Sequence, residues 1–552
     1  MPRLHSAAEL EKLRAGILGA RDPAKPCIAI CAGAACHGLD SLRVVNAFEA
    51  EVAKRDLGAK LDIRATGCHG FCEKGPDVVV NPGEICYFEV KPEDVPDIVA
   101  HTMKGEVLER LLYTDPTTGE KAIHLGEVPF YKRQTRLLLG DNPRIDPMRI
   151  DDYLALGGYA ALAKALFEMS PDQVLDEIKQ ANLRGRGGGG FPAGLKWETA
   201  KNAAGEDKYV IVNAHEGEPG AFMDRALFTG NPHRVIEGLI IGAYAIGSHR
   251  GFIYTRHDSP LLTRHIETAL AQAEEYGLLG ENILGSGFSL KVELHFDVGI
   301  FVSGESSALM RSIEGNPPEP RPKYIRTSVA GIWDSPSNLN NVETWANVPQ
   351  IIGRGAQWYR SIGTERSKGT KLVSLSGNVV NSGVAEVPMG TSLRTIVYDI
   401  GGGVPGGKPP KAVHLGGPMG GSIPERLFDT PLDFDALAKL GAPIGAGGLL
   451  VVAEETDMVE VARYLLEFLT NESCGKCVPC REGMRQMLKI LTNITKGKGK
   501  NGDLSRLEDL SEVTGAACLC ALGRTAPDPL HSMLAYFKDE FEAQIARGTT
   551  PQ

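Results

Sequence analysis

The sequence predicts a multidomain α/β protein that ends in a helical bundle. Three observations lead to this prediction. The chain has 552 residues, which at roughly 100 to 200 residues per domain corresponds to about three or four domains. Residues 151–369 alternate helical and extended patterns with short loops, as α/β domains do. From Asp457 onward, the stretches MVEVARYLLEFL and MLAYFKDEFEAQI carry apolar residues at helical spacing.

The composition excludes several classes of protein. Lys and Arg total 59 and Asp and Glu total 69, so the net charge of −10 gives no electrostatic basis for binding nucleic acid or anionic lipid. Hydrophobic residues are 42% and charged residues 23%, which is typical of a globular protein. Residues 1–20 have the pattern of a charged amphipathic helix rather than a secretion signal. Apolar stretches such as 239–247 are too short for a membrane span, which needs roughly 20 residues.

The eleven cysteines fall into two groups near opposite ends of the chain. Six lie between Cys27 and Cys86, five lie between Cys474 and Cys520, and the long stretch between the groups has none. Two dense groups favour two metal or cluster sites in a reducing compartment over the disulfides of a secreted protein. We therefore expect a cytoplasmic protein.

The N-terminal group contains two pairs of cysteines on loops. Cys31 and Cys36 are spaced C-x4-C after the apolar run IAI, and Cys68 and Cys72 are spaced C-x3-C in a glycine-rich loop. Four thiolates on two loops suit a 2Fe-2S centre, and zinc would take the same four sulfurs. Three cysteines remain as ordinary buried thiols, namely Cys27, Cys86 and Cys518.

A glycine-saturated loop follows the first predicted helix of the α/β region. Ser170 and Pro171 are typical of the first positions of a helix, and this helix leads into the sequence RGRGGGG. Glycines let backbone N–H groups approach a phosphate or a flavin closely, and Arg184, Arg186 and Lys196 add positive charge nearby. The loop matches neither the dinucleotide fingerprint nor the P-loop. A flexible hinge is the alternative interpretation.

Two acidic elements follow in the same region. A buried strand at 209–212 leads into the loop NAHEGEPG, and Glu305 stands at the start of a helix. The Pro-rich loop after that helix carries Arg321, Lys323 and Arg326, which would suit phosphates. The alternative is that Glu305 only caps its helix and that the basic side chains are solvated surface charges.

The C-terminal cysteines have the spacing of an iron–sulfur site. Cys474, Cys477 and Cys480 form C-x2-C-x2-C, which lets three thiolates converge on one cluster while a fourth comes from elsewhere. The stretch GAACLCALG supplies that ligand and holds both Cys518 and Cys520. Zinc sites usually combine two short pairs of ligands, each of two Cys or of Cys and His, rather than three closely spaced cysteines and a distant fourth. The spacing therefore favours a 4Fe-4S cluster over a zinc-stabilised binding protein.

Several stretches of the chain resemble a known family, the NADH-binding flavoprotein subunit of respiratory complex I. The resemblance is closer still to the relatives of that subunit in NAD-linked and electron-bifurcating hydrogenases and in NAD-linked formate dehydrogenases. Residues 26–101 resemble the thioredoxin-like 2Fe-2S ferredoxin domain fused to many of these subunits. The matching stretches of residues 151–546 are, in order, RGRGGGGFPAGLKW, NAHEGEPGAFMDR, SGESSALMRSIEG, NLNNVET, EVPMGTSLR, ESCGKCVPCREG and CALGRTAPDPL.

The resemblance implies a function and a set of partners. NAD(P)H would give a hydride to FMN, and electrons would then pass singly to the 4Fe-4S cluster, because a flavin can divide an electron pair. The chain would be an NAD(P)H dehydrogenase-type subunit of a hetero-oligomeric oxidoreductase. Its partners would be iron–sulfur and catalytic subunits, as in hydrogenases or formate dehydrogenases, some of which bifurcate electrons.

The resemblance also implies a domain organisation. A thioredoxin-like 2Fe-2S domain with an N-terminal helix would span residues 1–101, and a linker would span 102–150. The FMN and nucleotide-binding α/β domain would span 151–369. A ubiquitin-like β-grasp insert would span 370–440, and a helical bundle with the 4Fe-4S cluster would span 441–552.

Site residues follow from the same motifs. Glu218 matches the acidic residue beside the nicotinamide and is the expected catalytic residue. The residues expected to hold FMN are Gly185, Arg186, Gly187, Gly188, Lys196, Asn213, Glu216 and Asn340. The residues expected around the nucleotide are Phe191, Glu305, Ser306, Lys323 and Arg326. The expected ligands of the 4Fe-4S cluster are Cys474, Cys477, Cys480 and Cys520, with Cys520 rather than Cys518 at the family's fourth position.

The departures from the family gather around the nucleotide. His215 replaces an acid near the flavin, and Ser306 replaces a glutamate expected near the adenosine ribose. Thr199 and Arg326 stand where aromatic residues are common. Losing a carboxylate and gaining an arginine would admit a 2′-phosphate, so the substrate is either NAD(H) or NADP(H). The same losses would also follow if the nucleotide site had lapsed and the chain were an electron relay and scaffold.

Overall fold

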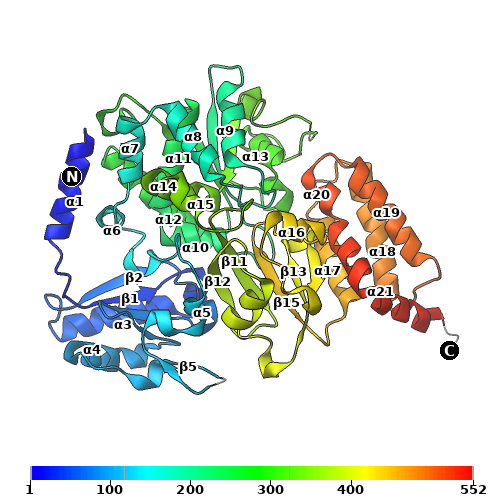
Figure 1. Cartoon of the computed structure of the whole chain (residues 1–552), viewed down its shortest axis with the longest axis horizontal. Helices are drawn as coiled ribbons and strands as arrows, with labels where there is room; N and C mark the ends of the chain where they lie inside the picture. The colour runs from blue at the N-terminus through cyan, green and yellow to red at the C-terminus, as the bar shows by residue number, and fades with distance from the viewer. Residues whose placement is uncertain (1–2, 117, 323, 550–552) are drawn as a thin grey trace.

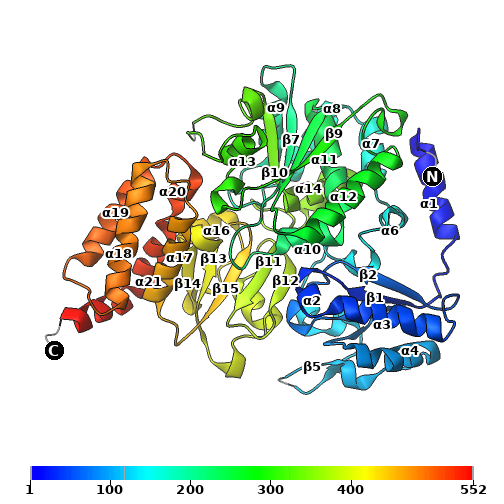
Figure 2. The same ribbon diagram turned by 180° about the vertical axis from the view of Figure 1, so that it is seen from behind.

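The computed structural model describes residues 3–116, 118–322 and 324–549, which form four packed units. In Figure 1 the chain passes from an N-terminal sheet (blue) to an α/β unit (green), a second sheet-rich unit (yellow) and a helical bundle (orange to red). The yellow unit lies between the N-terminal sheet and the bundle, with the α/β unit above it; Figure 2 shows the same order from behind.

The N-terminal unit is a four-stranded sheet in the order β2-β1-β3-β4. Strand β1 pairs parallel with β2 and antiparallel with β3, which pairs antiparallel with β4. The strands are β1 (Cys27–Cys31), β2 (Asp62–Thr66), β3 (Val78–Asn81) and β4 (Ile85–Tyr87), and the helices are α2 (Ala34–Gly38), α3 (Ser41–Lys54) and α4 (Val95–Lys104). Cys31 is the last residue of β1, after the apolar run as the sequence predicts, but Cys36 lies in the short helix α2 and not on the expected loop.

Helix α1 (Ala7–Gly19) packs away from this sheet, against the α/β unit. Its Leu10 is buried, and its Arg14 donates from Nε to the carbonyl of Leu154 at 3.1 Å. The segment 102–150, expected as a linker, forms the short elements β5 (Tyr113–Thr114), β6 (Lys121–Ala122) and α5 (Pro129–Lys132). Phe130 in α5 stacks on Phe71 with ring centroids 4.3 Å apart, so this segment packs tightly because it buries aromatic rings.

The α/β unit is built on a parallel sheet in the order β10-β7-β8-β9. Alternate residues of β7 point to opposite faces: Val210 and Val212 pack with α11 and α14, whereas Ile211 packs with α13 on the other face. The strands are β7 (Tyr209–Ala214), β8 (Arg250–Thr255), β9 (Lys291–Phe296) and β10 (Ser337–Asn341). The helices are α6 (Ile150–Ala155), α7 (Ala160–Glu168), α8 (Pro171–Ala181), α9 (Ala193–Asn202), α10 (Met223–Gly230), α11 (Pro232–Ile246), α12 (Pro260–Glu275), α13 (Ser306–Ile313), α14 (Val342–Arg354) and α15 (Ala356–Arg360).

The predicted start of α8 is confirmed. The Ser170 side chain accepts a hydrogen bond from the Gln173 N–H, and the Gln173 side chain accepts from the Ser170 N–H. This reciprocal capping box satisfies two backbone donors that a helix start leaves unpaired.

The third unit is a five-stranded sheet in the order β12-β11-β15-β13-β14. Its elements are β11 (Thr370–Gly377), β12 (Gly383–Pro388), β13 (Pro410–Leu415), β14 (Gly421–Pro424), α16 (Phe434–Lys439) and β15 (Gly448–Ala453). The central strand β15 pairs with both β11 and β13. The domain boundary expected at residue 440 falls before β15. Because β15 joins the β11–β12 hairpin to the β13–β14 hairpin, this sheet extends beyond that boundary.

The C-terminal helices pack on the β14 edge of this sheet. Ser532 accepts a hydrogen bond at 2.9 Å from the N–H of Ser422 in β14, and Lys411 pairs with Glu540 at 3.0 Å. The helices are α17 (Met458–Asn471), α18 (Met484–Thr495), α19 (Asp503–Ala517), α20 (Ala521–Thr525) and α21 (Asp528–Thr549). In the part of the chain that the structure describes, no helix has the length and hydrophobicity required to cross a membrane.

Candidate functional site

The residues expected to hold FMN gather at the carboxyl edge of the parallel sheet, and we call this place, bounded by Gly187, Lys196, Asn213 and Asn340, the FMN crevice. Asn213 near the end of β7 is in register with Asn341 at the end of β10, and Asn340 precedes it. The strand order reverses between β7 and β10, and ligands of open α/β sheets bind at such a switch point. The sheet therefore brings the predicted residues Asn213 and Asn340 to one edge.

The glycine loop is pressed against this edge. A Cβ atom added to Gly187 would lie 2.9 Å from Cβ of Asn341, closer than packing allows. Gly188 has φ +120° and pairs with Gly445 of the third unit. Glycine is therefore required at both positions. A loop held this closely is better explained as a backbone site for an anionic group than as a flexible hinge.

Lys196 supplies the positive charge beside the loop. Its Nζ donates to the carbonyl of Leu339 at 2.9 Å and lies 3.5 Å from Oδ1 of Asn340. The lysine on α9 and the amides of β10 thus meet next to the glycine loop. The Lys196 ammonium group, the side-chain amides and the backbone N–H groups of the glycine loop are hydrogen-bond donors. Such a set of donors suits FMN and its phosphate.

Arg186 plays a different part from the one its charge suggests. Its side chain is fully buried, and its guanidinium donates to the Tyr359 hydroxyl at 3.1 Å. It also donates to three backbone carbonyls, those of Arg184, Lys368 and Thr370. Its backbone N–H also donates, to the Thr344 hydroxyl at 2.9 Å. Because these donors are occupied within the protein, Arg186 holds the loop in place for the neighbouring glycines.

Two glutamates of the NAHEGEPG loop lie in contrasting surroundings. Glu216 accepts from the N–H groups of Asp224 and Arg225 at 2.8 and 3.1 Å, so it caps the start of α10. Glu218 has a buried Oε1 with no hydrogen-bond partner among the described residues. Its carboxyl lies against Gly417 and Gly448 of the third unit, where an added Cβ would collide with it. Burial, helped by the neighbouring Glu216, raises the pKa of Glu218 to about 7.

His215 is held by a buried carboxylate that sequence analysis missed. Its Nε2 lies 3.0 Å from Oδ2 of Asp297, and the other oxygen of Asp297 lies 2.7 Å from Nδ1 of His257. Burial acts to raise the pKa of Asp297, but the hydrogen bonds from both histidines outweigh it and hold that pKa well below its usual range. The three residues lie just after the ends of β7, β9 and β8, so the parallel pairing of these strands brings them together. No local motif marks Asp297 or His257.

A cavity of about 320 Å³ lies next to the crevice and gathers most of the predicted nucleotide residues. Glu305 caps α13 by accepting from the N–H groups of Ser307 and Ala308 at 2.8 and 3.1 Å, which confirms its interpretation as a helix cap. Predicted residue Lys323 lies outside the described residues. The predicted residues that line the cavity are Phe191, Lys196, Glu305, Ser306 and Arg326, and Thr199 and Arg321 join them.

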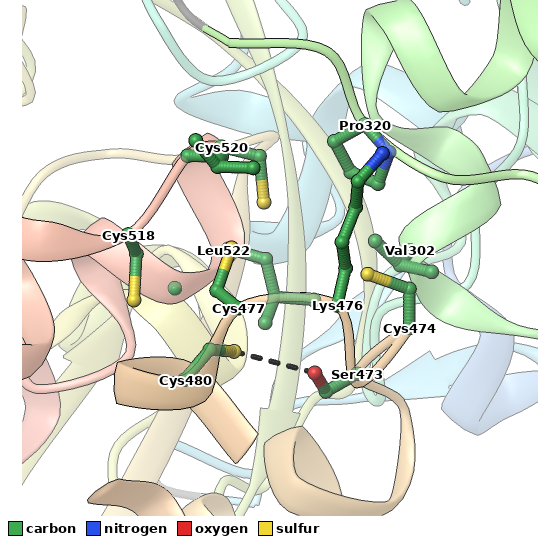
Figure 3. Close-up of a pocket in the computed structure, with 12 residues that line it drawn as sticks. Val302, Pro320, Ser473, Cys474, Lys476, Cys477, Cys480, Cys518, Cys520 and Leu522 are labelled. Atoms are coloured by element: carbon green, nitrogen blue, oxygen red, sulfur yellow. Dashed lines mark hydrogen bonds between the residues drawn. The ribbon is translucent and has the colours of Figure 1, made fainter. Parts of the chain in front are cut away.

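The C-terminal thiols gather in a second cavity (Figure 3). It is lined by Cys474, Cys477, Cys480, Cys518 and Cys520. The neighbouring Cys518 thiol lowers the pKa of Cys480 to about 7, towards the thiolate that a cluster requires.

The spacing of these sulfurs separates a cluster from zinc. Tetrahedral zinc with Zn–S bonds of about 2.3 Å would draw its sulfurs to within roughly 4 Å of one another. Among the described residues, no three ligand atoms of this cavity lie within 4.8 Å of one another. The wider arrangement of an all-sulfur donor set fits the four corners of a 4Fe-4S cluster.

The N-terminal cysteines lie closer together. The sulfurs of Cys31 and Cys36 are 3.3 Å apart, and those of Cys68 and Cys72 are 3.9 Å apart. Gly33, between Cys31 and Cys36, lies against Cys68, because a Cβ added to it would be 2.8 Å from Cβ of Cys68. The two pairs are therefore neighbours. The carboxylate of Asp77 lies within 4.8 Å of the Cys31 and Cys36 sulfurs. Two pairs of thiols fit a 2Fe-2S centre, in which each pair holds one iron, and sulfurs this close together also fit zinc.

A single turn connects the crevice and the C-terminal cluster cavity. In the 3-10 turn η7 (Phe301–Gly304), Val302 lines the cluster cavity. The carbonyl of Gly304 accepts from Nδ2 of Asn213 at 3.0 Å. On the far side, Lys476 of the cysteine loop pairs with Glu319 of the Pro-rich loop at 3.1 Å. The place for a two-electron carrier therefore adjoins the place for a one-electron carrier.

Comparison with known proteins gives two family matches and several relatives. Residues 178–350 match the Nuo51 FMN-binding domain, and residues 460–544 match the NADH-ubiquinone oxidoreductase-F iron-sulfur binding region. The chain is 48% identical over 414 residues to the NADP-reducing hydrogenase subunit HndC of Solidesulfovibrio fructosivorans, covering 75% of this chain and 84% of that protein. It is 45% identical over 402 residues to an NADH-quinone oxidoreductase subunit of Rhizobium meliloti, covering 73% and 96%.

A solved structure resembles nearly the whole chain. It is a chain of the NAD+-reducing NiFe hydrogenase in the H2-reduced state, with a TM-score of 0.67 and 27% sequence identity. The likeness covers 99% of this chain and 90% of that one. The similarity in fold thus extends over all four units.

Proposed function

Because this chain belongs to the family of FMN- and 4Fe-4S-binding flavoprotein subunits found in NADH-quinone oxidoreductases and NADP-reducing hydrogenases, we propose that it is an electron-input subunit. It transfers electrons between NAD(P)H and iron–sulfur clusters in a multi-subunit oxidoreductase. The observation that carries this function is the turn η7, which borders both the FMN crevice and the cluster cavity.

Different residues of the chain bind FMN, position it and hold the 4Fe-4S cluster. FMN, when bound, supplies the change from two-electron to one-electron chemistry. Backbone N–H groups of Gly187 and Gly188, with Lys196, hold its phosphate, and Asn213 and Asn340 position it from the sheet edge. Four thiolates hold the 4Fe-4S cluster, namely Cys474, Cys477, Cys480 and Cys520.

Anaerobic stopped-flow spectroscopy tests this function. Reduced nucleotide is expected to bleach the flavin absorbance, and the cluster signal is expected to appear afterwards. Bleaching by neither NADH nor NADPH would favour the electron-relay and scaffold function instead.

Glu218 is expected to make nucleotide oxidation depend on pH. Its carboxylate stabilises the positive charge that develops on the nicotinamide as the hydride leaves, and its pKa of about 7 means that this charge is present above pH 7. The rate of flavin bleaching should therefore rise as the pH increases through about 7. In Glu218→Gln the rate should be about tenfold lower at pH 8 and nearly independent of pH. Glu206→Gln, an exposed control, should keep the wild-type profile; an unchanged profile in Glu218→Gln would remove Glu218 from the reaction.

The nucleotide cavity favours NADP(H). Arg321 is already paired with Glu314 and Asp334, at 3.2 and 2.9 Å, whereas none of the ion pairs found among the described residues involves Arg326. Its guanidinium can therefore pair with a 2′-phosphate, and Ser306 places no carboxylate against it.

This preference is testable by substitution. NADPH should bleach the flavin at least as fast as NADH in the wild type, and Arg326→Gln should weaken NADPH binding about tenfold, with NADH changed less than about twofold. Ser306→Glu should shift the preference towards NADH, because a carboxylate binds the ribose hydroxyls and repels a phosphate. Equal losses of affinity for NADPH and NADH in Arg326→Gln would show that Arg326 does not contact the 2′-phosphate. The stopped-flow dependence on nucleotide concentration measures each case.

The proposal also covers the fold and the metal content of the N-terminal unit and the third unit. The N-terminal unit, with Cys31, Cys36, Cys68 and Cys72, is a thioredoxin-like domain that holds a 2Fe-2S centre, supported by its two close sulfur pairs. The third unit is a ubiquitin-like β-grasp domain, supported by two hairpins that flank a last, central strand. Anaerobically purified protein should contain iron and acid-labile sulfide in equal amounts and no zinc.

The setting of the protein follows from its cysteines and its relatives. All eleven cysteines are free, which suits a reducing compartment, and we place the chain in the cytoplasm. Its partners are iron–sulfur and catalytic subunits of a hydrogenase, formate dehydrogenase or similar complex, which agrees with its similarity to a subunit of an NADP-reducing hydrogenase.

A further inference from the structure

A cavity that the proposed function leaves unused lies between the third unit and the bundle. Its volume is about 450 Å³, within the range of about 300 to 1,000 Å³ that is typical of small-molecule sites. Strand β15 lines it with Leu449 and Leu450, and helix α17 lines it with Val461, Tyr464 and Leu465. Figures 1 and 2 both show α17 beside the sheet of the third unit. We call this place the β15–α17 cavity.

Two apolar side chains of this cavity are exposed to solvent although their neighbours are buried. Leu450 is 36% exposed and is the only exposed residue of β15, the central strand of its sheet. Tyr464 is 54% exposed, whereas Ala462 and Leu465 beside it on α17 are buried. A ligand that covers both side chains would remove apolar surface from water, which favours binding.

The cavity adjoins the glycine loop through close backbone contacts. Gly417 lines the cavity, and a Cβ added to it would lie 2.2 Å from Cδ of Glu218. Its neighbour Gly416 touches Gly445, because a Cβ added to Gly445 would lie 2.3 Å from Cα of Gly416. Gly445 in turn pairs with Gly188. Glu218 and these glycines therefore connect the cavity with the loop that borders the FMN crevice.

Glu218 gives the cavity a hydrogen-bonding group. Its carboxyl lines the cavity, and its Oε1 has no hydrogen-bond partner among the described residues. Because burial raises the pKa of Glu218 to about 7, both forms of the carboxyl are present near neutral pH. The ionised form accepts from a hydroxyl group, and the protonated form donates to a carbonyl oxygen. His414 also lines the cavity, but its ring nitrogens are already bonded to Ser422 and Gly417.

The charge of this cavity differs from that of the nucleotide cavity. The nucleotide cavity is lined by three cations that suit phosphate groups, namely Lys196, Arg321 and Arg326. Among the described residues that line the β15–α17 cavity, none is Lys or Arg, and three are acidic, namely Glu218, Asp457 and Glu460. A nucleotide or any other phosphate ester would meet carboxylates here without a lining cation, so the cavity suits an uncharged ligand.

We propose that the β15–α17 cavity is a second ligand site, which binds an uncharged aromatic ring compound whose hydroxyl or carbonyl group bonds to Glu218. The apolar side chains of β15 and α17 suit the faces of the ring. Of the residues expected to act in the proposed function, only Glu218 lines the cavity, so binding here requires neither FMN nor the clusters.

Equilibrium dialysis of the full-length protein against 2-naphthol tests this site. This probe is fluorescent, planar and uncharged near neutral pH, and it carries one hydroxyl group. Naphthalene-2-sulfonate has the same rings and a negative charge. We expect saturable binding of 2-naphthol at about one molecule per chain, and binding of the sulfonate in this cavity should be at least about tenfold weaker.

Substitutions locate the bound probe. Leu450→Glu places a further carboxylate in the cavity wall and should weaken 2-naphthol binding about tenfold. Tyr464→Ala removes a ring without adding charge and should weaken binding about threefold. Leu42→Glu makes the first change at a leucine of α3 that is 51% exposed, and it should bind the probe as wild type does. Thermal unfolding of each variant separates loss of the site from loss of the fold.

Four results would overturn the proposal. Absence of saturable 2-naphthol binding would exclude the site. Equal binding by wild type, Leu450→Glu and Tyr464→Ala would place the probe elsewhere. Sulfonate binding that matches 2-naphthol binding and is also weakened in Leu450→Glu would show that the cavity accepts anions. Binding to the isolated chain that disappears in the purified complex would assign the cavity to a partner subunit. None of these results depends on the oxidation of NAD(P)H, so failure of the proposed function is distinguishable.

Discussion

Replacing Cys477 by alanine should remove the 4Fe-4S cluster while flavin chemistry persists. Cys477 is the middle thiol of the C-x2-C-x2-C loop, and the cavity it lines has no histidine or carboxylate to replace it. Loss of one of four ligands should lower cluster retention by at least about 100-fold, since even changes at residues that only contact the ligands cost roughly 10- to 100-fold in metal affinity. The 4Fe-4S EPR signal should disappear, and electron delivery to a one-electron partner should fall with it.

The flavin readouts distinguish this loss from misfolding. FMN content and bleaching by reduced nucleotide should stay within about twofold of wild type, because the FMN crevice is built by the parallel sheet and not by the bundle. Cys27→Ala, at a buried thiol of β1 outside both cysteine sites, should keep both the EPR signal and the flavin. A normal 4Fe-4S signal in Cys477→Ala would refute the ligand set, and Cys518 would then be the first substitute ligand to examine.

Gly187→Ala should release FMN, and Gly189→Ala should not. The added methyl at Gly187 would lie 2.9 Å from Cβ of Asn341, and Asn341 cannot move freely because its Oδ1 caps α14 by accepting from Glu343 N–H at 2.9 Å. At Gly189 no atom lies within 4 Å of the added methyl. Overpacking of this kind costs about 1 to 3 kcal/mol, so the affinity for FMN should fall roughly tenfold or more.

Flavin titration by fluorescence quenching measures this difference. Because the two substitutions are identical and only two positions apart, changes in loop flexibility should affect both alike. Equal loss of FMN in both variants would point to obstruction of the crevice and not to the Asn341 contact. Normal affinity in both would mean that the glycine loop does not cradle the cofactor.

The loops and helix starts were predictable because their information is local. The cap of α8 by Ser170 and the position of Cys31 at the end of a strand both follow from neighbouring residues, and both are confirmed. The glycine loop was also visible in the sequence, but not its contact with Asn341. That contact depends on β10, which is more than 100 residues away in the chain and is brought to β7 only by parallel pairing.

Arg186 shows that the role of a side chain within a motif can differ from the role its charge suggests. Its charge within the glycine loop suggested a phosphate contact, but the guanidinium is buried and bonded to Tyr359 and to backbone carbonyls. A buried charge must satisfy its donors, and the partners that do so come from positions up to 184 residues away. No spacing rule in the sequence reports such partners.

The sequence by itself determined the chemistry of this protein: the thiol spacing of the two cysteine groups, the glycine loop and the family motifs, all of which depend on residues a few positions apart. The tertiary structure decided how these parts meet. It joined His215 to Asp297, 82 residues away, and placed η7 between the FMN crevice and the cluster cavity. It also placed Cys518 in the same cavity as Cys480. Local spacing fixes local geometry, whereas strand order and helix packing decide which distant side chains share a buried site.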